Sequence, residues 1–99
     1  MNVVGMYCMY HNDMWLILRK TNDLVLIINI DDVKKQVKLE NVTLRLDVQT
    51  AVEVTHQGTT YLVTPKFRIF SMLTYKRMHW PANNGNRVQI VETARNLLI

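Results

Sequence analysis

Apolar and polar residues alternate along most of the first three-quarters of the chain, and a period of two is typical of short β-strands with one buried face. Clusters of turn-forming residues separate these stretches, for example His11-Asn12-Asp13 and Asp31-Asp32. We therefore expect a mainly β protein. The pattern predicts strands over residues 3–10, 14–19, 24–30, 33–40, 42–48, 51–55, 59–63, 66–73 and 77–80.

Three of these stretches carry stronger signals than alternation alone. Residues 24–30 form a nearly continuous Leu, Val and Ile run, which is typical of a strand in the middle of a sheet. Residues 51–55 and 59–63 flank His56-Gln57-Gly58, where the glycine can adopt a positive φ. The stretches 51–55 and 59–63 therefore predict a β-hairpin.

The period changes to that of a helix in the last segment. Asn86 precedes the change, and its side chain can accept a hydrogen bond from an early backbone N–H. We expect an amphipathic helix over residues 87–97, within the segment 86–98. Arg87 is among the residues available for its solvent-facing side. The apolar stripe expected to pack on the sheet consists of Val88, Val91, Ala94, Leu97 and Leu98, with Ile90 at its margin.

The spacing of the strands leaves no room for helical crossovers, so their pairing is expected to be antiparallel. A sheet this small exposes its edges unless it curls. The predicted fold is mainly β (α+β): a small antiparallel, partly open β-barrel with an extra β-hairpin and one C-terminal amphipathic helix. We expect a single domain over residues 1–99, with a barrel-like part over 1–50, a basic β-hairpin region over 51–80 and a helix over 86–98.

Composition narrows the class of protein. With 99 residues, 48% hydrophobic and 20% charged, the chain suits one globular domain and not a disordered segment. Its single cysteine, Cys8, excludes an internal disulfide framework. The longest apolar run is far shorter than the roughly 20 residues that cross a bilayer, and the first 13 residues lack a secretory pattern. We expect no membrane association and a cytoplasmic location, in the host cytoplasm if a phage encodes the protein.

Basic residues are concentrated in the last part of the chain. The formal net charge is +4. Residues 1–59 contain six basic and seven acidic side chains, whereas residues 60–99 contain six basic side chains and one acidic side chain, Glu92. This asymmetry indicates an anionic partner. The alternative is that a modest positive charge only keeps a small domain in solution.

Aromatic residues interleave with the basic ones in the late hairpin, and this combination is typical of nucleic-acid surfaces. Basic side chains neutralise phosphates, and aromatic rings stack on unpaired bases. The alternative is that Phe67, Phe70 and Trp80 belong to the core while the basic residues solvate an outer face. The residues predicted to bind nucleic acid are Lys66, Arg68, Tyr75, Lys76, Arg77, Trp80 and Arg87.

Catalytic groups are sparse. Cys8 lies within a predicted strand, where a buried, inert thiol is expected. His11 and Asp13 share one turn but have no third partner, and His56 and His79 have no metal ligand at a suitable spacing. There is no glycine-rich phosphate loop. We therefore expect no enzyme activity, no cofactor and no metal.

Two parts of the chain resemble known families. Residues 59–80 resemble the modular DNA-binding motifs that accompany nucleases of phages and mobile elements. Phe67 stands where those motifs carry a glycine. This resemblance implies DNA binding and a phage or mobile-element origin. The residues that carry it are Tyr61, Val63, Thr64, Arg68, Ile69 and Ser71. In the N-terminal half, a glycine ahead of a predicted hairpin, Gly5, resembles the opening of KOW and Tudor-type small barrels.

Two functions remain open. The first is a small, non-enzymatic nucleic-acid-binding accessory protein, which the resemblance implies is phage-encoded and which is expected to contact DNA in preference to RNA. The second is a phage-encoded, protein-binding modulator or inhibitor of a host enzyme, since methionine and aromatic residues suit adaptable interfaces and the chain has six Met and two Trp. A homodimer through an open barrel edge is a variant of the second. The charge asymmetry favours the first.

Overall fold

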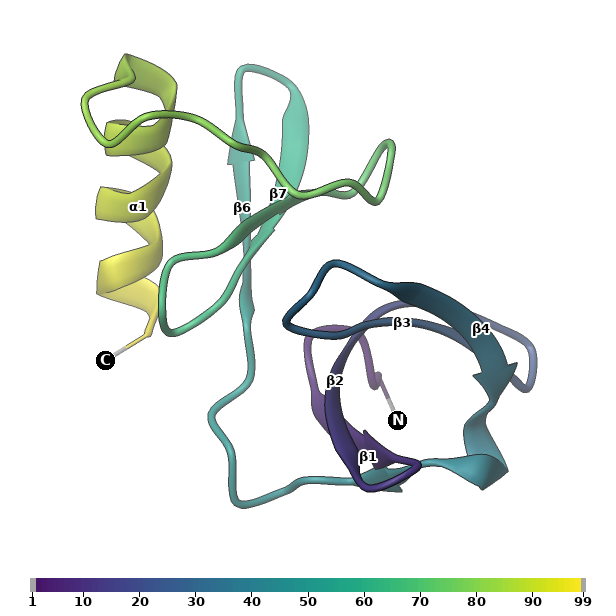
Figure 1. Cartoon of the computed structure of the whole chain (residues 1–99). Helices are drawn as coiled ribbons and strands as arrows, with labels where there is room; N and C mark the ends of the chain where they lie inside the picture. The colour runs from purple at the N-terminus through teal and green to yellow at the C-terminus, as the bar shows by residue number, and fades with distance from the viewer. Residues whose placement is uncertain (1, 99) are drawn as a thin grey trace. The chain divides into compact units, whose positions relative to one another are not determined.

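The structure is a computed structural model that describes residues 2–98. It confirms a mainly β chain with antiparallel pairing and a C-terminal helix, and it shows that the strands form two sheets (Figure 1). The chain divides into two compact units, Met1–Thr50 and Ala51–Ile99, and each sheet belongs to one of them. Within the described residues, no helix is both long and apolar enough to cross a bilayer.

The first unit contains a five-stranded sheet with the order β4-β3-β2-β1-β5. Within the described residues its end strands, β4 and β5, do not pair with each other, so the sheet is not a closed barrel. A short 3₁₀ helix, Leu39–Asn41, leads from β4 to β5. The strands are β1 (Tyr7–Tyr10), β2 (Asp13–Thr21), β3 (Leu24–Ile28), β4 (Lys34–Lys38) and β5 (Thr43–Leu44).

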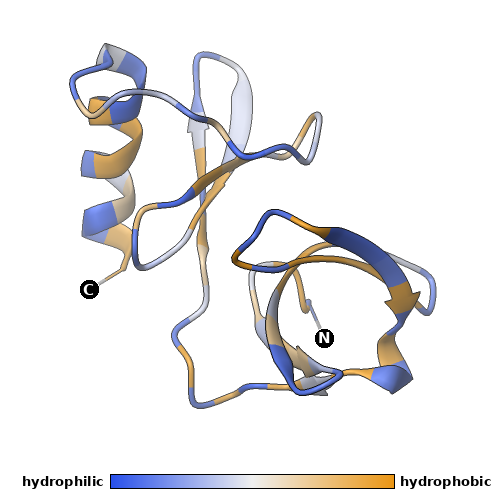
Figure 2. Cartoon of the chain, viewed as in Figure 1, coloured by the Kyte–Doolittle hydropathy of each residue, from blue (hydrophilic) through white to orange (hydrophobic). Residues whose placement is uncertain are grey.

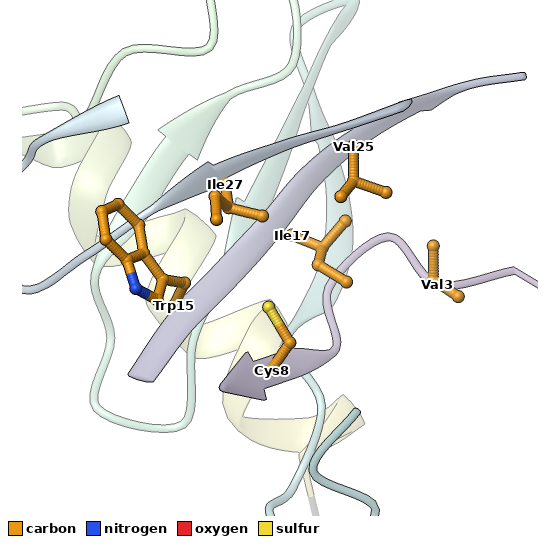
Figure 3. Close-up of a cluster of buried hydrophobic side chains, with 6 residues drawn as sticks. All are labelled: Val3, Cys8, Trp15, Ile17, Val25 and Ile27. Atoms are coloured by element: carbon orange, nitrogen blue, oxygen red, sulfur yellow. The ribbon is translucent and has the colours of Figure 1, made fainter. Parts of the chain in front are cut away.

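One cluster of buried side chains in this unit lies on one face of the sheet, and Leu16 and Ile28 are buried on the other face. Ile17 of β2 pairs with Ile27 of β3, and opposite residues of an antiparallel pair share a face. Their buried neighbours include Val3, Cys8 and Trp15 (Figure 3). Strand β3 is hydrophobic along its length, whereas β4 is mostly hydrophilic (Figure 2). The lysines of β4 suit an edge strand, because charged side chains discourage pairing with another chain.

The first two strands are joined by a tight turn at the position that the sequence predicted. Tyr10 and Asp13 pair across it, and the two residues between them, His11 and Asn12, have φ values of 50° and 63°. Positive φ at both central residues is typical of a type I′ hairpin turn, whose twist matches that of the strands.

Strand β1 is shorter than predicted. It begins at Tyr7 instead of Val3, because Val4 and Gly5 form a turn in which Gly5 has a φ of 88°. The Gly5 N–H donates a 2.8 Å hydrogen bond to the carbonyl of Ile17. The turn therefore stays attached to β2 although it is not part of the sheet.

The strand predicted over residues 42–48 is also wrong for most of its length. Only Thr43 and Leu44 are paired, with β1. Arg45 and Asp47 form a two-point ion pair, with both N–O distances 2.8 Å, across the turn that follows. Hydrogen bonding to Arg45 lowers the pKa of Asp47 to about 2. The turn leaves Leu46 exposed, contrary to the alternation.

The second unit is a three-stranded sheet with the order β6-β7-β8, and α1 packs against β6 (Figure 1). The hairpin predicted between residues 51 and 63 is confirmed, with Gln57 and Gly58 both at positive φ in its turn. The elements are β6 (Val52–His56), β7 (Thr59–Val63), β8 (Ile69–Ser71) and α1 (Gly85–Leu97). The core between sheet and helix consists of Val54, Val63, Ile69, Ile90, Val91 and Ala94.

The helix is present as predicted, but its start and its buried face differ. Its N-cap is Asn84, not Asn86. Val88 and Leu97, expected in the apolar stripe, are 46% and 55% exposed, whereas Ile90, expected at the margin, is fully buried. The contact with β6 buries the face that contains Ile90, Val91 and Ala94. The sequence did not determine which face is buried, because apolar residues occur around much of the helix.

Candidate functional site

One pocket of about 300 Å³ lies in the second unit and combines basic, aromatic and apolar side chains. Its three arginines come from three separate segments: the loop before β8, the segment after β8 and the first turn of α1. None of the described residues that line it is acidic. The lining residues are Phe67, Arg68, Ile69, Arg77, Met78, His79, Trp80 and Arg87.

A tight loop between β7 and β8 forms one wall. Pro65 presets the backbone for a turn, and the Phe67 N–H donates to the Thr64 carbonyl at 2.8 Å. The Thr64 N–H donates to the Arg68 carbonyl at 2.9 Å, which closes a three-residue loop. Loops of this length place their last residue in the left-handed region. Phe67 has a φ of 61°, a conformation in which glycine is usual.

Phe67 is held in this unfavourable conformation by its surroundings. Its side chain packs against the core of the second unit, and the guanidinium carbon of Arg95 lies 5.1 Å from its ring centre. A bulky residue at positive φ is strained, and such strain persists only where neighbouring contacts maintain it. The core of the second unit and Arg95 therefore hold Phe67 in its position in the pocket wall.

Arg68 follows the loop and is half-buried. Its backbone N–H donates to Thr64 Oγ1 at 3.0 Å, and its guanidinium carbon lies 5.8 Å from the ring centre of Phe70. Its Nη1 is buried and has no hydrogen-bond partner among the described residues. A buried donor without an acceptor is costly, so an anionic ligand that reached this nitrogen would relieve the cost.

The segment after β8 brings Arg77 to the same site. The Ser71 N–H donates to the Lys76 carbonyl at 2.9 Å, and Arg77 then forms a bridge opposite Phe70. The Phe70 ring is also the one beneath Arg68. The turn that follows β8 thus places Arg77 next to Phe70, the residue whose ring Arg68 also contacts.

The third arginine is positioned by the start of the helix. Asn84 Oδ1 accepts a 3.1 Å hydrogen bond from the Arg87 N–H. Arg87 is four residues before Val91 and seven before Ala94, so it shares the buried face of α1. It is half-buried at the pocket, which corrects the expectation that it faces solvent. The first turn contains no acidic residue to balance it.

Trp80 and His79 complete the polar and aromatic part of the lining. The Trp80 ring meets the Tyr61 ring edge to face, with centres 5.7 Å apart, and Trp80 also packs against the core. His79 is exposed at the pocket. Trp80 therefore contacts the core and also lines the pocket. The sequence had left a core position and a position on the binding surface as alternatives.

The structure brings together some of the predicted binding residues and separates others. Four of the seven line the pocket: Arg68, Arg77, Trp80 and Arg87. Three do not: Lys66 and Lys76, which are exposed, and Tyr75, which is half-buried.

The predicted strand over residues 66–73 is reduced to Ile69–Ser71. Lys66 therefore lies in the loop, and it does not share a strand face with Arg68 as the alternation had indicated. The cause is Pro65 and the left-handed Phe67, which keep the chain in a turn until Arg68. Among the pocket residues that were not predicted, His79 had a usable signal, since it adjoins Trp80 in the basic and aromatic segment.

Apart from His79, the groups considered for catalysis lie outside the pocket. Cys8 is fully buried, and its burial raises the pKa of the thiol to about 11. The His11 ring stacks on Tyr10, and Asp13 accepts a hydrogen bond from a neighbouring backbone N–H. His56 Nε2 lies 3.0 Å from Asn86 Oδ1. The described residues contain no group of three or more His, Cys, Asp or Glu side chains that could hold a metal ion.

Comparison of the chain with protein-family models, curated proteins and solved structures finds no match.

Proposed function

We propose that the protein is a small, non-enzymatic nucleic-acid-binding accessory protein and that the pocket of the second unit is its contact with phosphate. The observation that carries this proposal is the convergence of Arg68, Arg77 and Arg87 on one pocket without an acidic lining residue. Guanidinium groups bind phosphate oxygens through paired N–H donors, which makes arginine well suited to such a site.

The charge of the second unit supports an anionic ligand. Residues 51–99 contain six basic side chains and only two acidic ones, Glu53 and Glu92, whereas residues 1–50 contain six of each. An excess of positive charge around a concave site attracts anions and raises their rate of association. The resemblance of residues 59–80 to phage and mobile-element DNA-binding motifs favours DNA and a phage-encoded protein.

We also propose that the first unit is a partly open barrel. Three features support curvature of its sheet: the meander from β1 to β4, the return of β5 to the side of β1, and a register shift between Ile17 and Arg19 on β2. Such an irregularity bends a strand and increases its twist.

The proposal is tested by titrating fluorescein-labelled 20-nucleotide DNA, single-stranded and duplex, and following anisotropy at 50 and 200 mM NaCl. If the three arginines each neutralise one phosphate, the affinity for a single strand should fall about 20-fold over this range. The double variant Arg68→Gln/Arg87→Gln should bind about tenfold or more weakly at 50 mM and lose most of the salt dependence.

The matched control is Lys66→Gln/Lys76→Gln, which removes the same charge from two exposed positions outside the pocket. It should lose clearly less affinity than the arginine pair. Circular dichroism melting checks that each variant is folded, and Arg87→Gln alone serves if Arg68 proves necessary for folding. Absence of binding at 50 mM NaCl overturns the proposal in favour of a protein partner, and equal losses in both pairs overturn the role of the pocket.

A further inference from the structure

The size of the pocket limits what can enter it. A volume of about 300 Å³ is at the lower end of the range, about 300–1,000 Å³, that is usual for small-ligand sites. A duplex presents a convex row of phosphates with its bases stacked inside, and it can only lie across such a hollow. A single unpaired nucleotide can enter, because its base and phosphate are both free.

The lining has two chemical halves that match the two halves of a nucleotide. Arg68, Arg77 and Arg87 supply the N–H donors that phosphate oxygens accept. Trp80 and Phe67, with their apolar neighbours, supply surfaces for a flat ring. The apolar half is not needed to bind phosphate alone, and three arginines are not needed to bind an apolar ligand.

Contacts within the second unit hold both halves in place. Trp80 is held by Tyr61, and Phe67 lies under the guanidinium of Arg95. The backbone of Arg68 is fixed by Thr64, and its buried Nη1 has no acceptor among the described residues. A site whose groups are ordered in advance loses less conformational freedom when the ligand binds.

The helix adds to the attraction for the phosphate. Arg87 lies in the first turn of α1, where the backbone N–H groups give the helix end a partial positive charge. That turn carries no acidic side chain, so an external anion bound here would meet no negative side chain in the first turn of α1.

We propose that this pocket receives one unpaired nucleotide of a nucleic-acid strand, with its phosphate on the arginines and its base against the aromatic side. This inference rests on the proposed function and specifies its ligand. It predicts that the protein prefers single strands, and duplexes with an extruded nucleotide, over perfect duplexes.

The test compares three labelled DNAs at 100 mM NaCl: a single-stranded 12-mer, its blunt duplex, and the same duplex with one extra unpaired thymidine. The single strand and the bulged duplex should bind about tenfold more tightly than the blunt duplex, as expected for one stacked base. Thymidine monophosphate should displace the single strand at a lower concentration than inorganic phosphate does.

Variants separate the two halves of the site. Trp80→Leu should abolish the preference for unpaired DNA, and Trp80→Phe should retain most of it, because a phenyl ring still stacks. Arg87→Gln should weaken the binding of all three DNAs. If Trp80→Leu does not fold, the comparison of thymidine monophosphate with phosphate still decides the role of a base.

Each outcome has a distinct meaning. If the blunt duplex binds as well as the other two DNAs and the binding is sensitive to Arg68→Gln/Arg87→Gln, the inference of an unpaired nucleotide is overturned while nucleic-acid binding stands. If none of the DNAs binds at 100 mM NaCl and none binds when the salt is lowered to 50 mM, both proposals are overturned. If thymidine monophosphate and inorganic phosphate compete equally, the pocket recognises phosphate alone and the base has no place in it.

Discussion

Single residues in this protein take on roles that their neighbours in space decide. Phe67 adopts a backbone conformation that favours glycine, and contacts with the core and with Arg95 maintain it. The surroundings of Cys8 act in a similar way, since its thiol lies inside the core of the first unit. Burial disfavours the charged thiolate and so raises the pKa to about 11.

Cys8 should therefore react slowly with thiol reagents in the folded protein. A pKa raised from 9.0 to about 11 lowers the thiolate fraction at pH 8 about 100-fold, and burial slows access further. Alkylation by iodoacetamide at pH 8 should be at least about 100-fold slower in native protein than in 6 M guanidinium chloride. Rapid native labelling would show that the site opens.

The same shift gives a sign for the dependence of stability on pH. The folded state holds the thiol proton more tightly, so this contribution is complete below pH 9 and is lost as pH rises towards 11. Between these values the free energy of unfolding should fall more steeply for the wild type than for Cys8→Ala. Parallel curves would contradict the raised pKa.

At the scale of elements, turns and caps decide where strands and helices begin. Gln57 and Gly58 turn the β6–β7 hairpin with positive φ at both positions. Asn84 caps α1, and Gly85 is its first residue. These two glycines differ in backbone conformation. Gly58 has a φ of 79°, whereas Gly85 lies in ordinary helical backbone.

Replacing each glycine by alanine should consequently have opposite effects. An added Cβ meets no atom within 4 Å at either position, so only backbone preference changes. Gly58→Ala should lower the free energy of unfolding by about 1 kcal/mol, because alanine disfavours positive φ. Gly85→Ala should raise it by about 0.5 kcal/mol, because the unfolded chain becomes less flexible. Urea denaturation measures both, and equal signs would contradict this account.

For the whole molecule, the distribution of charge matters more than its total. The net charge of +4 lies entirely in the second unit, since the basic and acidic residues of residues 1–50 are equal in number. The pocket with its three arginines is in that same unit. We therefore expect the second unit to carry the proposed binding and the first to contribute no phosphate contacts of comparable strength.

Hydrogen–deuterium exchange with mass spectrometry, with and without a saturating single-stranded 12-mer, checks this division. Peptides covering residues 64–91 should exchange more slowly with ligand, and peptides from β4 should not change. Without ligand, β4 and β5 should exchange faster than β2 and β3 if the first sheet is a partly open barrel with free edges. Protection centred on the lysines of β4 would place the binding surface in the first unit.

The sequence predicted the presence of strands and the helix better than the residues at which they begin and end. The hairpins at His11-Asn12 and Gln57-Gly58 and the C-terminal helix were recognisable, because turn residues and the period of apolar positions are local properties. The ends of β1, β5 and β8 were wrong, because an alternating pattern continues through a turn without a change of residue type. Leu46, which fits the pattern and is exposed, is the clearest example.

The sequence by itself determined the class of fold, the order of most elements and the excess of positive charge in the late part of the chain. Tertiary structure decided which charges meet. Arg68, Arg77 and Arg87 are far enough apart along the chain that only the β7–β8 loop, the return after β8 and the docking of α1 on β6 bring them to one pocket. Lys66 and Lys76, which are just as basic, are left outside it. Charge is a property of the residue, whereas convergence depends on backbone conformation and packing between distant segments.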